Sequence, residues 1–202
     1  MSNSPVVRTL RLPSPDFFRL KVPRTLQPRR NWFRVHQTAH SARDFSLKPA
    51  HRFSHQKCPF PVLYLGVNID TCLFERFGDE IYDGAKTLPL SLWNAHSISW
   101  LEVPEIRVCD LTQPETLSAL AVDITALVNE KLDIPQAWGL AIQQHPLNFK
   151  GIKYKSRFND RACLALFQRD GIEDSLSVTP LGTLSSIDEA GDWLDKHRVR
   201  LY

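Results

Sequence analysis

The sequence lacks the signatures of several large protein classes. Its 202 residues include only 8 glycines, which never form the G-x-G-x-x-G or Walker loops that cradle nucleotide phosphates. The G-x-S-x-G turn that carries the nucleophile of many hydrolases is also absent. No apolar run approaches the roughly 20 residues of a membrane-spanning helix, so we expect no membrane partner.

The cysteines and histidines do not predict a disulfide framework or a metal site. The four cysteines are separated by 14, 37 and 54 positions, so there is no C-x-x-C pair. If His36 and His40 shared a strand, they would lie about 13 Å apart, too far to bind one ion. The group of His51, His55 and Cys58 lacks a second ligand pair. We therefore expect no metal. Charges and prolines interrupt the N-terminus, where a secretion signal would be apolar, and the cysteines are widely spaced, so we expect the protein in a reducing cytoplasm.

Charge is divided unevenly along the chain. Residues 1–60 hold 12 Lys and Arg and 2 Asp and Glu, whereas residues 61–202 hold 13 and 20. A basic front half is typical of a nucleic-acid arm, of a docking surface for an acidic partner, or of arginines that bind phosphate. Because no nucleic-acid motif accompanies it, we do not favour direct nucleic-acid binding. Prolines discourage regular structure in residues 1–30, so we expect a basic arm there and one domain over residues 31–202.

Periodicity predicts an α+β fold. Alternating or continuous apolar runs predict strands at 32–36, 62–65, 97–103, 106–111, 151–156, 161–167 and 176–184. We expect a helix that Asn68 caps and Gly78 ends. Another follows the capping-box pattern of Thr112 to Glu115, with Pro114 in its first turn, and runs towards residue 130. Further helices are predicted at 135–144 and 187–197.

Eight short segments in a fixed order carry a family resemblance. They are WFRVH (32–36), HRFS (51–54), VLYLG (62–66), CLFERFGD (72–79), RVCDLT (107–112), HP (145–146), GIKYKSR (151–157) and CLALF (163–167). This series resembles the RES-domain family, named for an Arg, a Glu and a Ser, over about residues 32–169. The resemblance implies an ADP-ribosyltransferase-like fold, a split β-structure with flanking helices around a cleft for NAD. It also implies a bacterial toxin whose partner is an Xre-type helix-turn-helix antitoxin.

The resemblance also implies the site residues. By motif position these are Arg34 of the first strand, Arg52 of the following loop, Tyr64 of the next strand, Glu75 of the helix and Ser156 of the late strand. Which of the two arginines is the arginine of the family's name stays open. The chain departs from the family where Phe53 and Ser54 follow Arg52, since a Trp and an Asn are commoner there. An aromatic residue is retained.

The implied reaction breaks the bond between nicotinamide and ribose in NAD, through an oxocarbenium-like transition state. Nicotinamide is cationic before it leaves and neutral afterwards, so one carboxylate suffices and no general acid is needed. We expect Glu75, Arg52 and Tyr64 to be catalytic. The planar fork of arginine suits pyrophosphate, so Arg34 and Arg52 would bind NAD, with Tyr64 beside the nicotinamide and Ser156 on the ribose or amide.

Plainer interpretations remain. Without the resemblance, Glu75 would be a surface carboxylate beside Arg76, and Arg34 an outward-facing strand residue. Our hypothesis is the NAD-consuming toxin of a type II toxin–antitoxin pair, with water or phosphate as acceptor. The alternatives are an ADP-ribosyltransferase that modifies a protein, and a non-catalytic module that binds through residues 1–60. A homodimer also stays open.

Overall fold

A computed structural model describes residues 12–45, 47, 51–55, 60–82, 86–128 and 131–202. Its strands and helices often follow one another in runs of one kind, such as β1 to β3 and α3 to α5, as is typical of an α+β fold. The strands are β1 Thr25–Gln27, β2 Arg30–Gln37, β3 Val62–Gly66, β4 Thr87–Leu88, β5 His96–Val103, β6 Ile106–Asp110, β7 Gly151–Lys155, β8 Ala162–Phe167, β9 Ser177–Thr183 and β10 Arg200–Leu201. The α-helices are α1 Ile69–Tyr82, α2 Leu90–Asn94, α3 Pro114–Leu120, α4 Ile124–Val128, α5 Asp133–Gln143 and α6 Asp188–His197.

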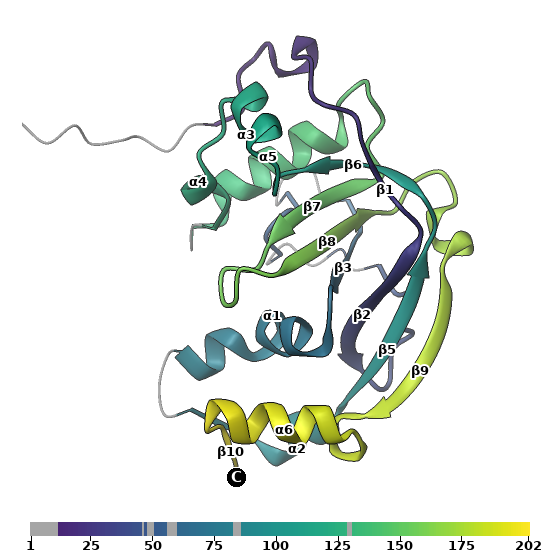
Figure 1. Cartoon of the computed structure of the whole chain (residues 1–202), viewed down its shortest axis with the longest axis vertical. Helices are drawn as coiled ribbons and strands as arrows, with labels where there is room; N and C mark the ends of the chain where they lie inside the picture. Colours follow the sequence, from purple (N-terminus) through teal and green to yellow (C-terminus); the bar gives the residue numbers. More distant parts are fainter. Residues whose placement is uncertain (1–11, 46, 48–50, 56–59, 83–85, 129–130) are drawn as a thin grey trace, which may run out of the picture.

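Eight of the strands form one sheet that is nearly divided in two. Its order is β1-β6-β7-β8-β3-β2-β5-β9. Strands β2 and β5 match over eight residue pairs and β3 and β8 over five, but β2 and β3 match only at Phe33 and Gly66. The sheet therefore splits between β3 and β2, and the two halves curl away from one another (Figure 1).

Two bent stretches of chain connect the halves. Strands β1 and β2 are separated by Pro28, and β5 and β6 by Pro104, which cannot donate a backbone hydrogen bond inside a continuous strand. Gln27 is matched with Ile106 and Arg30 with Val103, so both stretches bend at the same place. At this shared bend, the pair of β1 and β6 in one half of the sheet continues into the pair of β2 and β5 in the other half.

Helices pack at both ends of the divided sheet (Figure 1). At one end α3, α4 and α5 lie close to β6 and β7, where Trp138 and Phe149 are fully buried. At the other end α1, α2 and α6 share a core that contains Phe77, Trp93 and Trp193. Each such aromatic side chain contributes about 1.5–3 kcal/mol by leaving water. The space between these two packed ends is where the pocket lies.

Helix α1 confirms the predicted start but not the predicted end. The Asn68 side chain accepts a hydrogen bond from the Thr71 amide at 2.9 Å, as an N-cap does. Gly78 does not end the helix, which continues to Tyr82 and buries Ile81. A Cβ at position 78 would lie 2.5 Å from the ring of Phe158. Glycine is used here for close packing rather than for termination.

The capping box predicted at the start of α3 is wrong. Pro114 does occupy the first turn, but the N-cap is Gln113, which makes no side-chain capping bond. Thr112 instead uses its amide and hydroxyl to donate to the carboxylate of Asp110, at 3.0 and 2.5 Å. The buried carboxylate of Asp110 thus binds the Thr112 amide and hydroxyl that a capping box would use.

The described part of the N-terminal segment is more ordered than its prolines suggested. Phe17, in the 3-10 turn Phe17–Arg19, is buried with its ring against Trp138 and His145. Strand β1 pairs with β6. Residues 1–11 lie outside the described residues, and the division at residue 30 stays a prediction. No helix in the described ranges has the length and apolarity needed to cross a membrane.

Two helical glycines are expected to respond oppositely to alanine. In α5, a Cβ at Gly139 would lie 2.3 Å from the carbonyl oxygen of Phe53, so Gly139→Ala should destabilise the fold by about 1–3 kcal/mol. In α6, a Cβ at Gly191 meets nothing within 4 Å, and Gly191→Ala should stabilise by up to about 1 kcal/mol. Urea unfolding measures both, and a Gly139→Ala variant as stable as its parent would contradict the packing described.

Candidate active site

A pocket of about 540 Å³ lies where the sheet splits. This volume is ordinary for a small-molecule site. Its walls come from β2, β3, α1, the loop at residues 51–52 and the chain after β7. Four of the five predicted site residues line it: Arg34, Arg52, Tyr64 and Glu75. The charged residues in its wall are Arg34, Arg52, Arg76, Arg157, Glu75 and Asp79.

Both oxygens of the Glu75 carboxylate accept hydrogen bonds from hydroxyl groups. The Tyr154 hydroxyl donates to Oε2 at 2.9 Å and the Ser156 hydroxyl to Oε1 at 2.7 Å. Hydrogen bonds to a charged group contribute about 1.5–3 kcal/mol each. The two donors come from β7 and its end, whereas Glu75 comes from α1. They fix the carboxylate in one orientation towards the pocket.

Ser156, the fifth predicted residue, is not part of the pocket wall. It is almost fully buried and its hydroxyl is occupied by Glu75. Its proposed contact with ribose or amide stays a prediction. Tyr154 was missed by the sequence analysis, although strand alternation puts residues 154 and 156 on the same face. Its position on the same strand face as Ser156 could have identified Tyr154 from the sequence.

Arg34 enters the pocket from β2. Its guanidinium donates to the backbone carbonyl of Ala42 at 2.6 Å. Burial lowers the pKa of Arg34 to about 10, an effect that the carboxylate of Asp44 partly opposes. The side chain is still protonated at neutral pH. A half-buried, fixed cation of this kind is suited to bind an anionic group.

Arg52 is held from the other side of the pocket. Its Nη1 donates to the carbonyl of Leu127, in the last turn of α4, at 2.7 Å. The neighbouring Phe53 is fully buried, and its ring meets that of Tyr154 edge-on at 5.0 Å. Phe53, which stands where a Trp is commoner in the family, thus anchors the turn that carries Arg52.

Tyr64 both lines the pocket and supports that turn. Its hydroxyl oxygen accepts a hydrogen bond from the Phe53 amide at 2.9 Å. The His51 ring lies 5.2 Å from the Tyr64 ring. Burial raises the pKa of Tyr64 well above its usual value, so the phenol stays neutral. Tyr64 can therefore act at the site as a neutral hydrogen-bonding group.

The residues just after β7 close one side of the pocket. Arg157 forms an ion pair with Asp79 of α1, and its guanidinium lies 4.6 Å from the centre of the Phe158 ring. Phe158 in turn packs against Gly78. The sequence analysis missed Arg157 and Asp79, because one position lies in a turn and the other on a polar helix face. Neither has a periodic signal.

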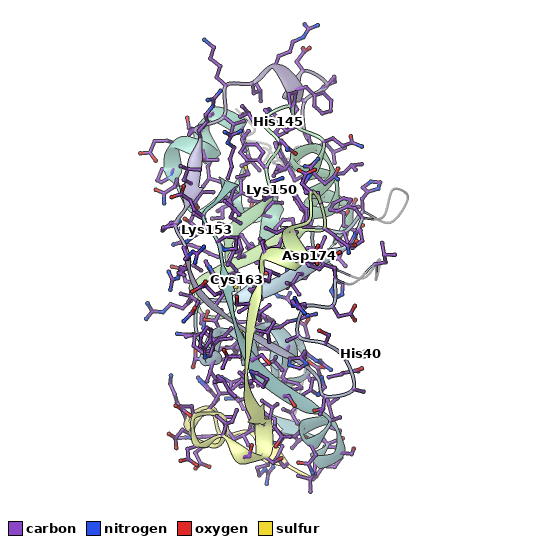
Figure 2. The ribbon with its side chains drawn as sticks, turned by 90° about the vertical axis from the view of Figure 1, so that its right-hand side faces the viewer. His40, His145, Lys150, Lys153, Cys163 and Asp174 are labelled. Atoms are coloured by element: carbon purple, nitrogen blue, oxygen red, sulfur yellow. The ribbon has the colours of Figure 1, made fainter. Side chains whose placement is uncertain are left out.

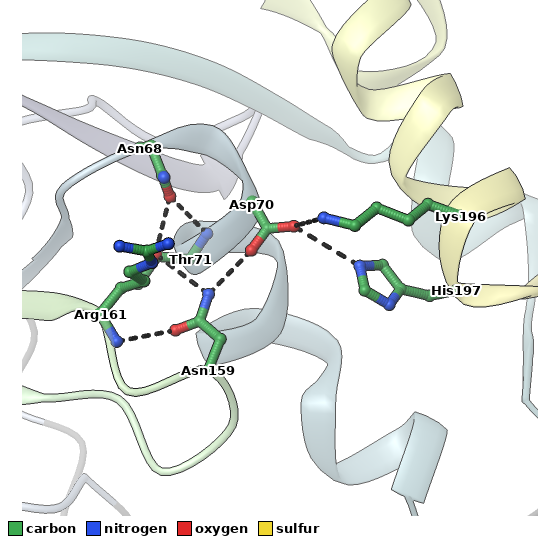
Figure 3. Close-up of polar contacts among 7 residues, drawn as sticks. All are labelled: Asn68, Asp70, Thr71, Asn159, Arg161, Lys196 and His197. Carbon is green, nitrogen blue, oxygen red and sulfur yellow. Dashed lines mark hydrogen bonds and ion pairs between the residues drawn. The ribbon is translucent and has the colours of Figure 1, made fainter.

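A polar cluster around Asp70 anchors that turn to α1 and α6 (Figure 3). The Asn159 side chain donates to Asp70 at 2.8 Å and to the Thr71 hydroxyl at 3.2 Å. Lys196 and His197 of α6 approach the same carboxylate at 3.3 and 3.5 Å. One carboxylate thus connects the start of α1, the β7–β8 turn and the end of α6.

No thiolate or metal centre is apparent in the described part of the site. Cys72 lines the pocket, but burial raises the pKa of its thiol to about 12, and the thiol donates to the Phe33 carbonyl at 3.0 Å. Among the described residues, no three His, Cys, Asp or Glu side chains gather as metal ligands. His40 and His145 lie far apart along the long axis of the molecule (Figure 2). Cys58 lies outside the described residues.

The divided sheet with helices packed at both of its ends is an ADP-ribosyltransferase-like fold. A model of the RES domain matches residues 31–184, and the chain belongs to the RES-domain family. Among solved structures, it is similar to a chain of the M. tuberculosis MbcT–MbcA toxin–antitoxin complex, with a TM-score of 0.62 and 16% identity over 87% of this chain and 93% of that chain. This likeness confirms the predicted fold. No curated protein matches significantly in sequence.

We expect the Asp70 cluster to stabilise the protein in a pH-dependent way. Burial acts to raise the pKa of Asp70, but hydrogen bonds from Asn159, Lys196 and His197 outweigh it and lower the pKa. A carboxylate with a lowered pKa stabilises the folded state above its unfolded pKa, near 3.9, and loses that contribution as the pH falls. Asp70→Asn should therefore cost about 0.5–1 kcal/mol at pH 7, and this cost should shrink as the pH is lowered towards 3.

Denaturant unfolding of the parent and variant at both pH values measures this difference. Asp192→Asn is the matched control, because Asp192 is an exposed carboxylate on α6 with no ion pair among the described residues. It should change stability by less than about 0.5 kcal/mol. An Asp70→Asn effect of equal size at pH 3 and pH 7 would show that the ion pairs are not its source.

Proposed function

We propose that this protein is the toxin of a toxin–antitoxin pair and that it inhibits growth by cleaving the nicotinamide–ribose bond of NAD. The observation that carries the proposal is the Glu75 carboxylate, held by two hydroxyl groups inside a pocket lined with arginines. Family membership and the fold of a toxin–antitoxin complex subunit also support it. Its setting would be the bacterial cytoplasm, where NAD is present.

One carboxylate is sufficient for this reaction. When the bond between ribose C1′ and nicotinamide N1 breaks, its electron pair leaves with N1, and the departing ring becomes neutral. Positive charge then develops at C1′ and the ring oxygen, as in glycoside hydrolysis. The negative charge of Glu75 stabilises that cation. Water then bonds to C1′ and releases a proton to solvent, or phosphate bonds there directly.

The arginines would bind the pyrophosphate of NAD, away from the bond that breaks. Arg34 and Arg52 approach the pocket from different elements, and each is held by a backbone carbonyl. Their planar groups can donate two parallel hydrogen bonds to phosphate oxygens. Binding the pyrophosphate in this way positions the distant ribose against Glu75, which converts binding energy into orientation. Tyr64 would supply a flat surface beside the nicotinamide.

Removing the Glu75 charge should abolish most of the activity. In Glu75→Gln, nicotinamide release from NAD should fall by about 100-fold or more, because a preorganised charge is lost at the reacting centre. Ser156→Ala and Tyr154→Phe should each lower kcat by about tenfold, since each removes one hydrogen bond from the carboxylate. Chromatographic measurement of nicotinamide tests all three variants.

Glu102→Gln is the control for that series, because Glu102 is a partly exposed β5 carboxylate paired with Arg29, away from the pocket. It should keep parental activity. If Glu75→Gln releases nicotinamide as fast as the parent, Glu75 is not the key residue. If neither protein releases it, with phosphate and cell extract supplied as acceptors, the enzymatic proposal is wrong and binding by the basic residues 1–60 is the hypothesis to pursue.

Expression of the protein alone should arrest bacterial growth and deplete cellular NAD. Glu75→Gln should relieve both effects, and co-expression of a cognate Xre-type helix-turn-helix antitoxin should also do so. Colony counts and NAD assays after induction measure this. Growth arrest with NAD unchanged, together with labelling of a cellular protein from a tagged NAD analogue, would identify an ADP-ribosyltransferase instead.

A further inference from the structure

Arg76 follows Glu75 directly and enters the same pocket, but the function proposed above gives it no role. Its side chain is one-third exposed. The guanidinium lies 4.8 Å from the centre of the Phe77 ring, and its Nη1 donates to Glu80 at 3.2 Å. In the described part of the chain, its Nη2 makes no hydrogen bond or ion pair. That nitrogen is available to meet an anionic ligand.

A buried histidine fixes the position of this guanidinium. The Nε of Arg76 donates to Nε2 of His96 at 3.0 Å. The Nδ1 of His96 lies 2.7 Å from the carbonyl oxygen of Leu92, in α2. His96 is 1% exposed, and its ring meets that of Phe77 edge-on at 5.4 Å. The imidazole is therefore packed tightly at the first position of β5.

The partners of His96 define its protonation state. A guanidinium nitrogen can only donate and a carbonyl oxygen can only accept. His96 must therefore carry its hydrogen on Nδ1 and present the lone pair of Nε2 to Arg76. This neutral tautomer is the one form of the ring that satisfies both neighbours. An imidazolium would point an N–H group at a guanidinium of the same charge.

We infer that His96 is a positioning residue, and that it aims Arg76 into the pocket as a third arginine that binds the phosphates of NAD. This inference rests on the proposed function. Phosphate binding is common to the ground state and the transition state, so its loss should raise KM and leave kcat nearly unchanged. Glu75, in contrast, is expected to act on kcat.

Asparagine and glutamine separate the two nitrogens of His96. An asparagine amide replaces Nδ1, so His96→Asn can keep the donation to Leu92 but gives Arg76 no acceptor. A glutamine carbonyl oxygen replaces Nε2, so His96→Gln keeps the acceptor for Arg76 and loses the bond to Leu92. Each variant removes one hydrogen bond from the same buried position. The two variants should therefore lower the stability of the fold by similar amounts. Only His96→Asn removes the acceptor of the hydrogen bond from Arg76.

The test measures kcat and KM for nicotinamide release, with the dissociation constant of ADP-ribose by calorimetry. We expect His96→Asn to raise KM and the dissociation constant by about tenfold, with kcat within about twofold of the parent. His96→Gln should stay within about threefold in all three constants. Arg76→Ala should raise KM at least as much as His96→Asn, and adding His96→Asn to it should change little further.

The pH dependence gives a readout that a merely structural role would not move. Burial lowers the pKa of His96, and the positive charge of Arg76 acts in the same direction. Protonation below that pKa removes the acceptor, so the parental KM should rise at acid pH. His96→Gln should lose this rise. Glu80 of α1 and His36 of β2 also face His96, and the pKa of His36 is lowered too. His36→Gln, which should keep the acid rise, is the control.

Equal effects of His96→Asn and His96→Gln on KM would overturn the inference, because the role of His96 would then be structural. Parental constants in His96→Asn, or an additive double variant, would overturn it as well. In both cases the parent still cleaves NAD, so the proposed function stands. A parent that neither cleaves NAD nor binds ADP-ribose removes the proposed function and this inference together.

Discussion

The contact between Glu75 and the two hydroxyl groups of Tyr154 and Ser156 connects the parts of the molecule that the split sheet separates. Glu75 belongs to α1, which packs with β2 and the helices at one end. The hydroxyl groups belong to β7 and its end, whose strand lies in the other half of the sheet. Strands β2 and β3 match at one residue pair only. The Glu75 carboxylate thus lines the pocket and also joins α1 to the end of β7 through two hydrogen bonds.

Backbone carbonyls give the arginines their positions. Arg34 donates to Ala42 and Arg52 to Leu127, while Arg76 is held by His96, which itself donates to Leu92. Arg76 is also paired with the Glu80 carboxylate, whereas the hydrogen bonds from Arg34 to Ala42 and from Arg52 to Leu127 end on carbonyl oxygens. A guanidinium has five N–H donors, so it can be fixed by a carbonyl and still present other donors to a ligand. The arginines of the pocket are therefore held in fixed positions by the protein itself.

Sequence reasoning predicted what depends on local pattern or motif order, and missed what depends on contacts between distant elements. Periodicity predicted strands β2, β3 and β5 to β9 and the Asn68 cap, but not the short strands β1, β4 and β10. The residues that line the pocket with Glu75 came from the order of motifs that carries the family resemblance. The end of α1 was wrong because Gly78 is a helix terminator in isolation, whereas here Phe158, 80 positions later, packs against it. The pairing of Arg76 with His96 is of the same kind: only the folded structure brings them together.

Among the described residues, Glu75 forms no ion pair, and two hydroxyl groups hold its carboxylate instead. A guanidinium against Glu75 would neutralise the charge that the proposed reaction would need, and burying such a pair costs desolvation energy. Hydroxyl groups fix both carboxylate oxygens without adding a positive charge. Asp79, the other carboxylate of the pocket, is instead paired with Arg157. Under the proposed function, the negative charge of Glu75 would thus be left for a cation that forms only during the reaction, and the arginines would be left for the phosphates.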